Sequence, residues 1–170
     1  MKSKVTIISR FSLLALIVAS FSFAGVALAQ QSGATKSSSL SAKDKTFMKK
    51  AAKGGTMEVT MGRLAEQNGQ SDDVKSFGKR MVTDHSKAND ELKSIAAQKG
   101  VKLPNKEPSE KWSSDKAYMD MVKDHEKDLA EFQEEASTGT DPDVKKFAED
   151  TAKVVQEHLD LAKQTQSKLQ

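Results

Sequence analysis

The three histidines of this chain each close a near-repeated five-residue phrase. MVTDH ends at His85, MVKDH at His125 and VVQEH at His158. Neutral imidazole offers a nitrogen lone pair to divalent transition metals and is among their commonest protein ligands. The repeated placement therefore predicts that the three side chains act together.

Helical periodicity places each histidine on the apolar seam of its own predicted helix. A further predicted helix, over 42–67, has no histidine, but its seam contains Glu58. Without partners, each such group would cost roughly 2–7 kcal/mol in an apolar core, so the groups need one another or an ion between them. One iron, copper, manganese or zinc ion is the predicted partner, with Glu58, His85, His125 and His158 as its ligands.

Acidic residues directly precede the histidines, at Asp84, Asp124 and Glu157. Each lies about 100° around the helix from the histidine that follows, so it is placed to hydrogen-bond a ligand rather than to bind the metal. Met81 and Met121 lie one turn before two of the histidines, and their thioethers would suit Cu(I). Methionine at helical spacing also fills cores, so both interpretations stay open.

A metal-free interpretation is open as well. Glu58 and the histidines could form a buried polar layer that fixes the register of the helices. The protein would then be a structural or interaction module of the cell envelope, related to stress tolerance. The sequence has no cysteine, Ser/His/Asp phrase or phosphate loop that would indicate an enzyme, and any activity is expected to be metal-dependent redox.

The chain after residue 41 is predicted to be all-α. Glycine and proline gather at three places, and apolar residues recur at steps of three and four. Ser41 and Asp141 are predicted N-caps, the second followed by Pro142 at the first helical position, and Gly100 is the predicted end of a helix. These signals predict helices over 42–67, 72–99, 114–136 and from 142 almost to the C-terminus. The expected fold is a four-helix bundle.

The depths of the four ionisable groups indicate the topology. Glu58 and His158 lie further into their helices than His85 and His125 do. All four approach one layer if the proline-containing segment 101–113 crosses the bundle and makes the third helix parallel to the second. We therefore expect a crossover between the second and third helices, with the simpler up-down-up-down order, which leaves a mismatch of about a turn, as the alternative.

Residues 1–29 have the features of a secretory signal peptide. Three basic residues precede or open an apolar run, and Ala27-Leu28-Ala29 suits cleavage before Gln30. A membrane anchor is the alternative, but the run is short for a span. We therefore expect an exported protein, periplasmic or associated with the outer membrane, with no transmembrane span in the mature chain.

Composition narrows the choice of partner. Without the signal, the 27 basic residues fall to 24 and equal the 24 acidic residues. A neutral chain with mixed charges does not indicate binding to nucleic acid, and a metal ion is the partner that the sequence favours. Residues 30–41 are Ser-rich and are predicted to be a flexible lead-in to a bundle domain over 42–170.

Several longer phrases carry a family resemblance, among them GGTMEVTMG at 54–62 and VKSFGKRMVTDHSKANDEL at 74–92. Over 42–163 the chain resembles the domain of unknown function 4142 family, exported bacterial proteins grouped with the ferritin-like bundles. The resemblance implies a ferritin-like fold and an envelope location, and no established activity. The positions matching the family's pattern are Gly54, Gly55, Glu58, Asp84, His85, Asp124, His125, Glu157 and His158.

The chain departs from the family pattern at one connection and from the di-iron ferritins at its histidines. The connection after LPNKEP is shorter than the family pattern. Di-iron ferritins place Glu three residues before each of two histidines, whereas this chain has Val82, Val122 and Val155, so the bridging carboxylates of a ferroxidase centre are missing. Gly54-Gly55 within a helix predicts a kink or the close approach of a neighbouring helix.

Overall fold

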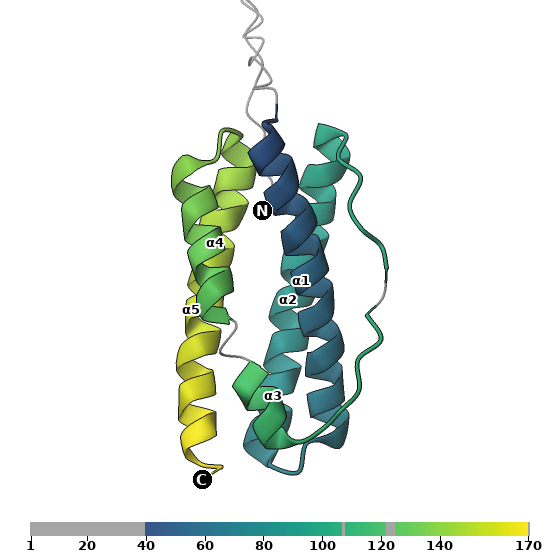
Figure 1. Ribbon diagram of the computed structural model, residues 1–170, viewed down its shortest axis with the longest axis vertical. Coiled ribbons are helices and arrows are strands. Elements are labelled where there is room, and N and C mark those ends of the chain that lie inside the picture. Colours follow the sequence, from purple (N-terminus) through teal and green to yellow (C-terminus); the bar gives the residue numbers. More distant parts are fainter. Residues whose placement is uncertain (1–39, 107, 122–124, 170) are drawn as a thin grey trace, which may run out of the picture. The chain divides into compact units, whose positions relative to one another are not determined.

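Helices make up most of what the computed structural model describes, which is residues 40–106, 108–121 and 125–169. The elements are α1 (Ala42–Asn68), α2 (Asp72–Lys99), α3 (Asp115–Met121), α4 (His125–Thr138) and α5 (Pro142–Ser167). The predicted all-α four-helix bundle is confirmed, with its third helix in two parts (Figure 1). The predicted signal and most of the predicted lead-in lie outside the described residues.

The helices begin and end at the capping residues that the sequence indicates. The Ser41 hydroxyl accepts a hydrogen bond from Asp44 N, and the Asp44 carboxylate accepts one from Ser41 N, both at 3.0 Å. Asp141 caps α5 by accepting a hydrogen bond from Asp143 N. Gly100 ends α2 with a φ of 68°, a left-handed conformation that glycine adopts without steric cost.

Contacts at the two ends of the bundle confirm the predicted crossover. At one end, Asp115 in α3 accepts hydrogen bonds from Gln70 N and Ser71 N in the α1–α2 turn. At the other end, Lys99 of α2 pairs with Asp141, the cap of α5, at 2.8 Å. The connection after α2 therefore runs along the bundle before α3 begins, and α4 is parallel to α2 (Figure 1).

Two described helices, α3 and α4, fall within the helix predicted over 114–136. Tyr118 and Met119 of α3 are buried beside Phe77 of α2, and Asp115 holds the first turn of α3 against the α1–α2 turn. Both α3 and α4 contact α5 and α1, and α4 packs along α5. Residues 122–124, which include the predicted Asp124, lie outside the described residues.

Two hydrophobic clusters form the core, and the histidines lie between them along α2 and α5. The first contains Phe47, Met48, Ala52, Leu92, Ile95, Ala96, Val144, Phe147 and Ala148. The second contains Met61, Ala65, Val74, Phe77, Met81, Tyr118, Met119 and Ala162. A polar layer therefore interrupts an otherwise apolar interior, as the seams predict.

α1 and α2 approach each other most tightly at two glycines. A Cβ added at Gly78 would lie 2.6 Å from Gly62 O, and one added at Gly62 would lie 2.8 Å from Gly78 O. Gly55 is crowded by Asn89 of α2, whereas a Cβ at Gly54 would have no neighbour within 4 Å. The close approach predicted for the Gly54-Gly55 pair is therefore present at Gly55 only.

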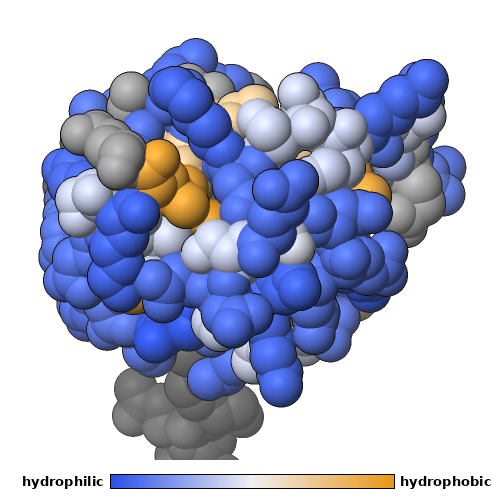
Figure 2. All heavy atoms as spheres, turned by 90° about the horizontal axis from the view of Figure 1, so that it is seen from below, coloured by the Kyte–Doolittle hydropathy of each residue, from blue (hydrophilic) through white to orange (hydrophobic). Residues whose placement is uncertain are grey.

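The outer faces of the helices are polar. Hydrophilic side chains cover most of the face in Figure 2, and hydrophobic atoms appear there in small, separate patches. Ion pairs such as Lys153–Glu149, at 2.9 Å, lie on exposed turns and stabilise the fold little individually. Within the described residues, no helix is both long enough and apolar enough to cross a membrane.

Candidate metal centre

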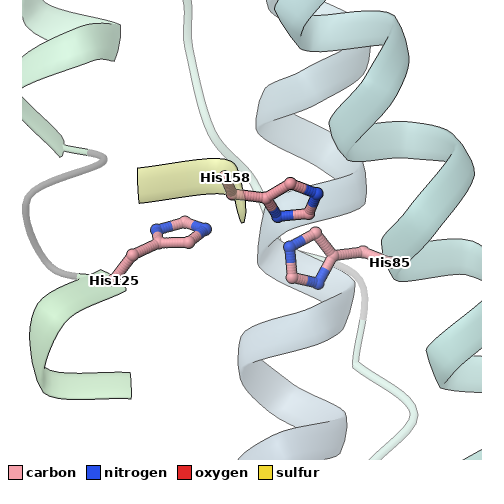
Figure 3. A group of neighbouring side chains, drawn as sticks. All are labelled: His85, His125 and His158. Atoms are coloured by element: carbon pink, nitrogen blue, oxygen red, sulfur yellow. The ribbon is translucent and has the colours of Figure 1, made fainter. Parts of the chain in front are cut away.

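Three imidazoles from three helices meet inside the bundle (Figure 3). His85 comes from α2, His125 from the first position of α4 and His158 from α5, with exposed fractions of 8, 1 and 0 %. The ring centroids of His85 and His158 are 5.1 Å apart, and His125 lies 5.9 Å from the first and 6.1 Å from the second. The common depth predicted for the histidines is thus present.

The spacing of the ring nitrogens is close to what one ion requires. Each histidine offers a nitrogen within 4.8 Å of one from each of the other two. Ligands bound tetrahedrally at about 2.0–2.1 Å lie roughly 3.4 Å from one another. Small side-chain rotations would therefore bring all three nitrogens onto one transition-metal ion.

Several of these buried nitrogens have no hydrogen-bond partner within the described part of the chain. They are Nε2 of His85, both ring nitrogens of His125 and Nδ1 of His158. Leaving a buried polar atom unsatisfied costs about 1–3 kcal/mol, so a core rarely accumulates several of them in one layer. An ion between the rings would give these lone pairs a partner.

The protonation states also suit metal binding. Burial, together with the neighbouring histidines, lowers the pKa of His85 to about 3. Burial likewise lowers the pKa of His125 to about 4, and the pKa of His158 is lowered for the same reason. All three rings are therefore neutral at pH 7, which is the form that coordinates a metal.

Asp84 is one of the acidic residues predicted to hydrogen-bond a metal ligand, and its partner in the structure is His158. Its Oδ2 lies 2.9 Å from His158 Nε2, on another helix, rather than beside His85. Burial alone would raise the pKa of Asp84, but hydrogen bonds from His158 and Arg80 lower it, so the group is ionised and can only accept. His158 Nε2 must then carry the hydrogen, which leaves the lone pair on Nδ1 available.

Arg80 extends this interaction to the surface. Its guanidinium donates to Asp84 at 2.7 Å and to Glu157 at 2.6 Å. Glu157, a predicted partner of a ligand, therefore acts two contacts away from His158, through Arg80 and Asp84. Sequence reasoning missed Arg80, although its spacing of four residues from Asp84 is a recognisable helical pair.

Glu58 lies beside one of the three histidines, and its carboxylate is not grouped with all three, as the predicted four-ligand set would require. Its Oε2 is 3.9 Å from His125 Nε2, and it forms a second group with His125 and Asp128, whose ligand atoms also lie within 4.8 Å of one another. Sequence reasoning missed Asp128, because acidic residues on outer faces are common. The signal that could have found it is the spacing of three from His125, which places both on one face of α4.

No contact in the described structure places the remaining predicted residues, Met81, Met121 and Asp124, as metal ligands. Met81 is fully buried in the second hydrophobic cluster, and Met121 packs against that cluster. These positions fit core filling. Asp124 lies outside the described residues, so its predicted role stays a prediction.

A pocket of about 400 Å³ reaches the centre from the surface. Glu58, His85, His125 and Asp128 line it, as do Gly54 and the aromatic rings of Phe47, Phe132 and Phe147. The absence of a side chain at Gly54 leaves room in its wall. Small solutes can thus approach two of the three histidines.

A comparison with protein families places the chain. The model of a family described as a domain of unknown function (DUF4142) matches residues 29–165. The chain belongs to the DUF4142 family. Searches of curated proteins and of solved structures found no match for it. In this DUF4142 protein, the matching positions Glu58, His85, His125 and His158 all lie in or beside the polar layer.

Proposed function

We propose that this DUF4142 protein binds a divalent transition-metal ion between His85, His125 and His158. The observation that carries the proposal is the layer of buried imidazole nitrogens without hydrogen-bond partners in the described structure. The neutral state of the three rings supports it, because each ring already has an unprotonated nitrogen that can bind a metal. Glu58, beside His125, remains the predicted source of a compensating negative charge.

The ligand set favours iron, copper, manganese or zinc over calcium or magnesium, since imidazole is a poor ligand for the last two. The protein would buffer such a metal, confer resistance to it or cycle its redox state. A ferroxidase role has less support, because Val82 and Val155 occupy the positions three residues before two of the histidines. Arg80 and Asp84 would orient the ligand His158 without contacting the metal themselves.

Export to the cell envelope is part of the proposal. It is supported by the charged start, apolar run and Ala27-Leu28-Ala29 of residues 1–29. Expression of the full chain followed by cell fractionation tests it, with N-terminal sequencing of the product. A mature protein that begins at Gln30 in the periplasmic or outer-membrane fraction is expected, and an uncleaved cytoplasmic chain would contradict export.

A metal-free polar layer is the second candidate, and the Arg80–Asp84–His158 contacts favour it. They tie α2 to α5 without any ion, as a register-fixing layer should. The protein would then act through a partner in the envelope. This candidate predicts that purified protein contains no metal and that its melting temperature is unchanged by added metals.

Metal analysis of protein purified without an affinity tag separates the two candidates. We expect close to one equivalent of metal in the wild type and loss of it in His125→Ala. Met119→Ala is the matched control, because it also truncates a buried side chain but removes no imidazole. Circular dichroism establishes that both variants are folded. Wild-type protein that stays empty after incubation with Fe(II), Zn(II), Co(II), Mn(II) and Cu(II) would exclude the metal-binding proposal.

A further inference from the structure

A second group of potential ligands adjoins the three histidines and shares one of them. Glu58 from α1 and Asp128 from α4 have carboxylate oxygens within 4.8 Å of His125 and of each other. Both carboxylates are half-buried, whereas His125 is only 1 % exposed and neither of its ring nitrogens has a hydrogen-bond partner in the described structure. The group therefore combines two exchangeable oxygen donors with a buried nitrogen donor.

The pocket orders the two groups from outside to inside. All three members of the carboxylate group line it, together with His85. His158 is fully buried and is not among the residues that line it. An ion that enters from solvent thus meets Glu58 and Asp128 before it can reach all three imidazoles.

The chemistry of the donors fits this order. A hydrated divalent ion exchanges its water readily for carboxylate oxygens, and the negative charges of Glu58 and Asp128 attract it. The imidazoles themselves are uncharged and buried, so they offer a cation little long-range attraction. Lys50, Lys53 and Lys127 also line the pocket, and Lys50 lies 3.3 Å from Glu131.

We propose that Glu58, His125 and Asp128 form an outer binding position for a divalent transition-metal ion, from which the ion passes to His85, His125 and His158. His125 remains bound during the transfer, while the carboxylates are exchanged for the other two imidazoles. The inference rests on the proposed metal binding and adds a route to it. Asp128 then controls how fast metal arrives and leaves, and contributes little to how tightly it is held.

Loading kinetics with Co(II) test the route. Cobalt bound by imidazole nitrogens absorbs visible light, so stopped-flow mixing of full-length apoprotein with Co(II) follows its arrival. We expect Asp128→Asn to slow loading at least tenfold, with an equilibrium affinity within twofold of wild type. Dissociation into excess chelator must then slow by the same factor as loading. Glu131→Gln is the matched control, because it removes the same charge from the same helix and pocket, outside the group.

A second variant tests the pocket without altering any ligand. Gly54→Leu adds a side chain in open space beside the pocket and should also slow loading without a change in affinity. Loading of Asp128→Asn within twofold of wild type would overturn the inference. So would a tenfold fall in its affinity, which would make Asp128 a ligand of the resident ion. Wild-type protein that takes up no cobalt would overturn metal binding itself, a distinct result.

Discussion

At the residue scale, the Asp84 carboxylate fixes which nitrogen of His158 faces the other histidines. Asp84→Asn would no longer hold the His158 Nε2 hydrogen with a charged acceptor, so we expect metal affinity to fall about 10–100-fold with every ligand still present. Competition with a chromophoric chelator measures this. Glu157→Gln removes an equal charge, but Glu157 hydrogen-bonds Arg80 rather than His158 in the described structure, so the affinity should change less than about threefold. Equal affinities for wild type and Asp84→Asn would show that this hydrogen bond has no role in binding.

A second buried acid lies away from the histidines, at the end of the bundle where α1 begins. Glu135 is 1 % exposed, and burial together with the neighbouring Asp44 carboxylate raises its pKa from 4.5 to about 7. Burial also acts to raise the pKa of Asp44, but hydrogen bonds from Thr140 and Ser41 outweigh it and lower that pKa. Between pH 4.5 and about pH 7, the folded protein therefore keeps a proton on Glu135 that the unfolded chain has released.

The sign of the pH effect follows. The contribution of Glu135 to stability is complete below pH 4.5 and is lost as the pH rises through 7. Relative to Glu135→Gln, wild-type protein should lose on the order of 2 kcal/mol of unfolding free energy between pH 4.5 and 8. Urea denaturation at several pH values measures the difference. Glu134→Gln, an exposed neighbour paired with Lys43, should show no such decline. A pH-independent difference for Glu135→Gln would mean that Glu135 is ionised throughout.

Which residues meet could be predicted from the sequence only in part. The period of three and four fixes the face of each helix, and that was sufficient to bring the three histidines together. The partner of Asp84 and the role of Asp128 depend on how far one helix is rotated and shifted against the next. Packing of the whole core sets those quantities, and local spacing does not contain them.

At the scale of elements, the helix ends were predictable because Ser41, Gly100 and Asp141 act on their own neighbours. The contact of Asp115 with the α1–α2 turn was not, because it depends on how α3 packs against another part of the fold. The crossover was predictable only through the histidines, since their depths agree in that topology. Positions that carry chemistry thus gave information on topology that the caps could not.

Alanine substitutions at two glycines, one in α1 and one in α2, should change the unfolding free energy in opposite directions. Gly78→Ala places a Cβ 2.6 Å from a backbone oxygen of α1, so overpacking should outweigh the gain in helix propensity and cost about 1–3 kcal/mol. Gly54→Ala meets nothing within 4 Å, so it should stabilise the protein by about 0.5–1 kcal/mol. Urea denaturation of both variants measures the pair. Equal changes in the two would show that α1 and α2 do not approach at Gly78 as described.

At the scale of the whole bundle, the polar layer lies where the chain's two hairpins meet. α1 pairs with α2, and α4 pairs with α5, on either side of the crossover. His85 belongs to the first pair, and His125 and His158 belong to the second. An ion between these rings therefore joins the halves of the fold, in a layer that contributes little hydrophobic stabilisation of its own.

If the bundle unfolds as one unit, an ion bound at this junction must stabilise every helix equally. Zn(II) at a free concentration 100 times its Kd should raise the unfolding free energy by about 2.7 kcal/mol. The gain should be the same for every helix that opens only when the whole bundle unfolds. Hydrogen exchange read by mass spectrometry should then show the slowest amides of α1, α2 and α5 gaining protection by one common factor, although α1 supplies no histidine. His125→Ala with Zn(II) is the control and should gain none. Protection confined to α4 and α5 would show that the two hairpins open independently and that the ion does not join them.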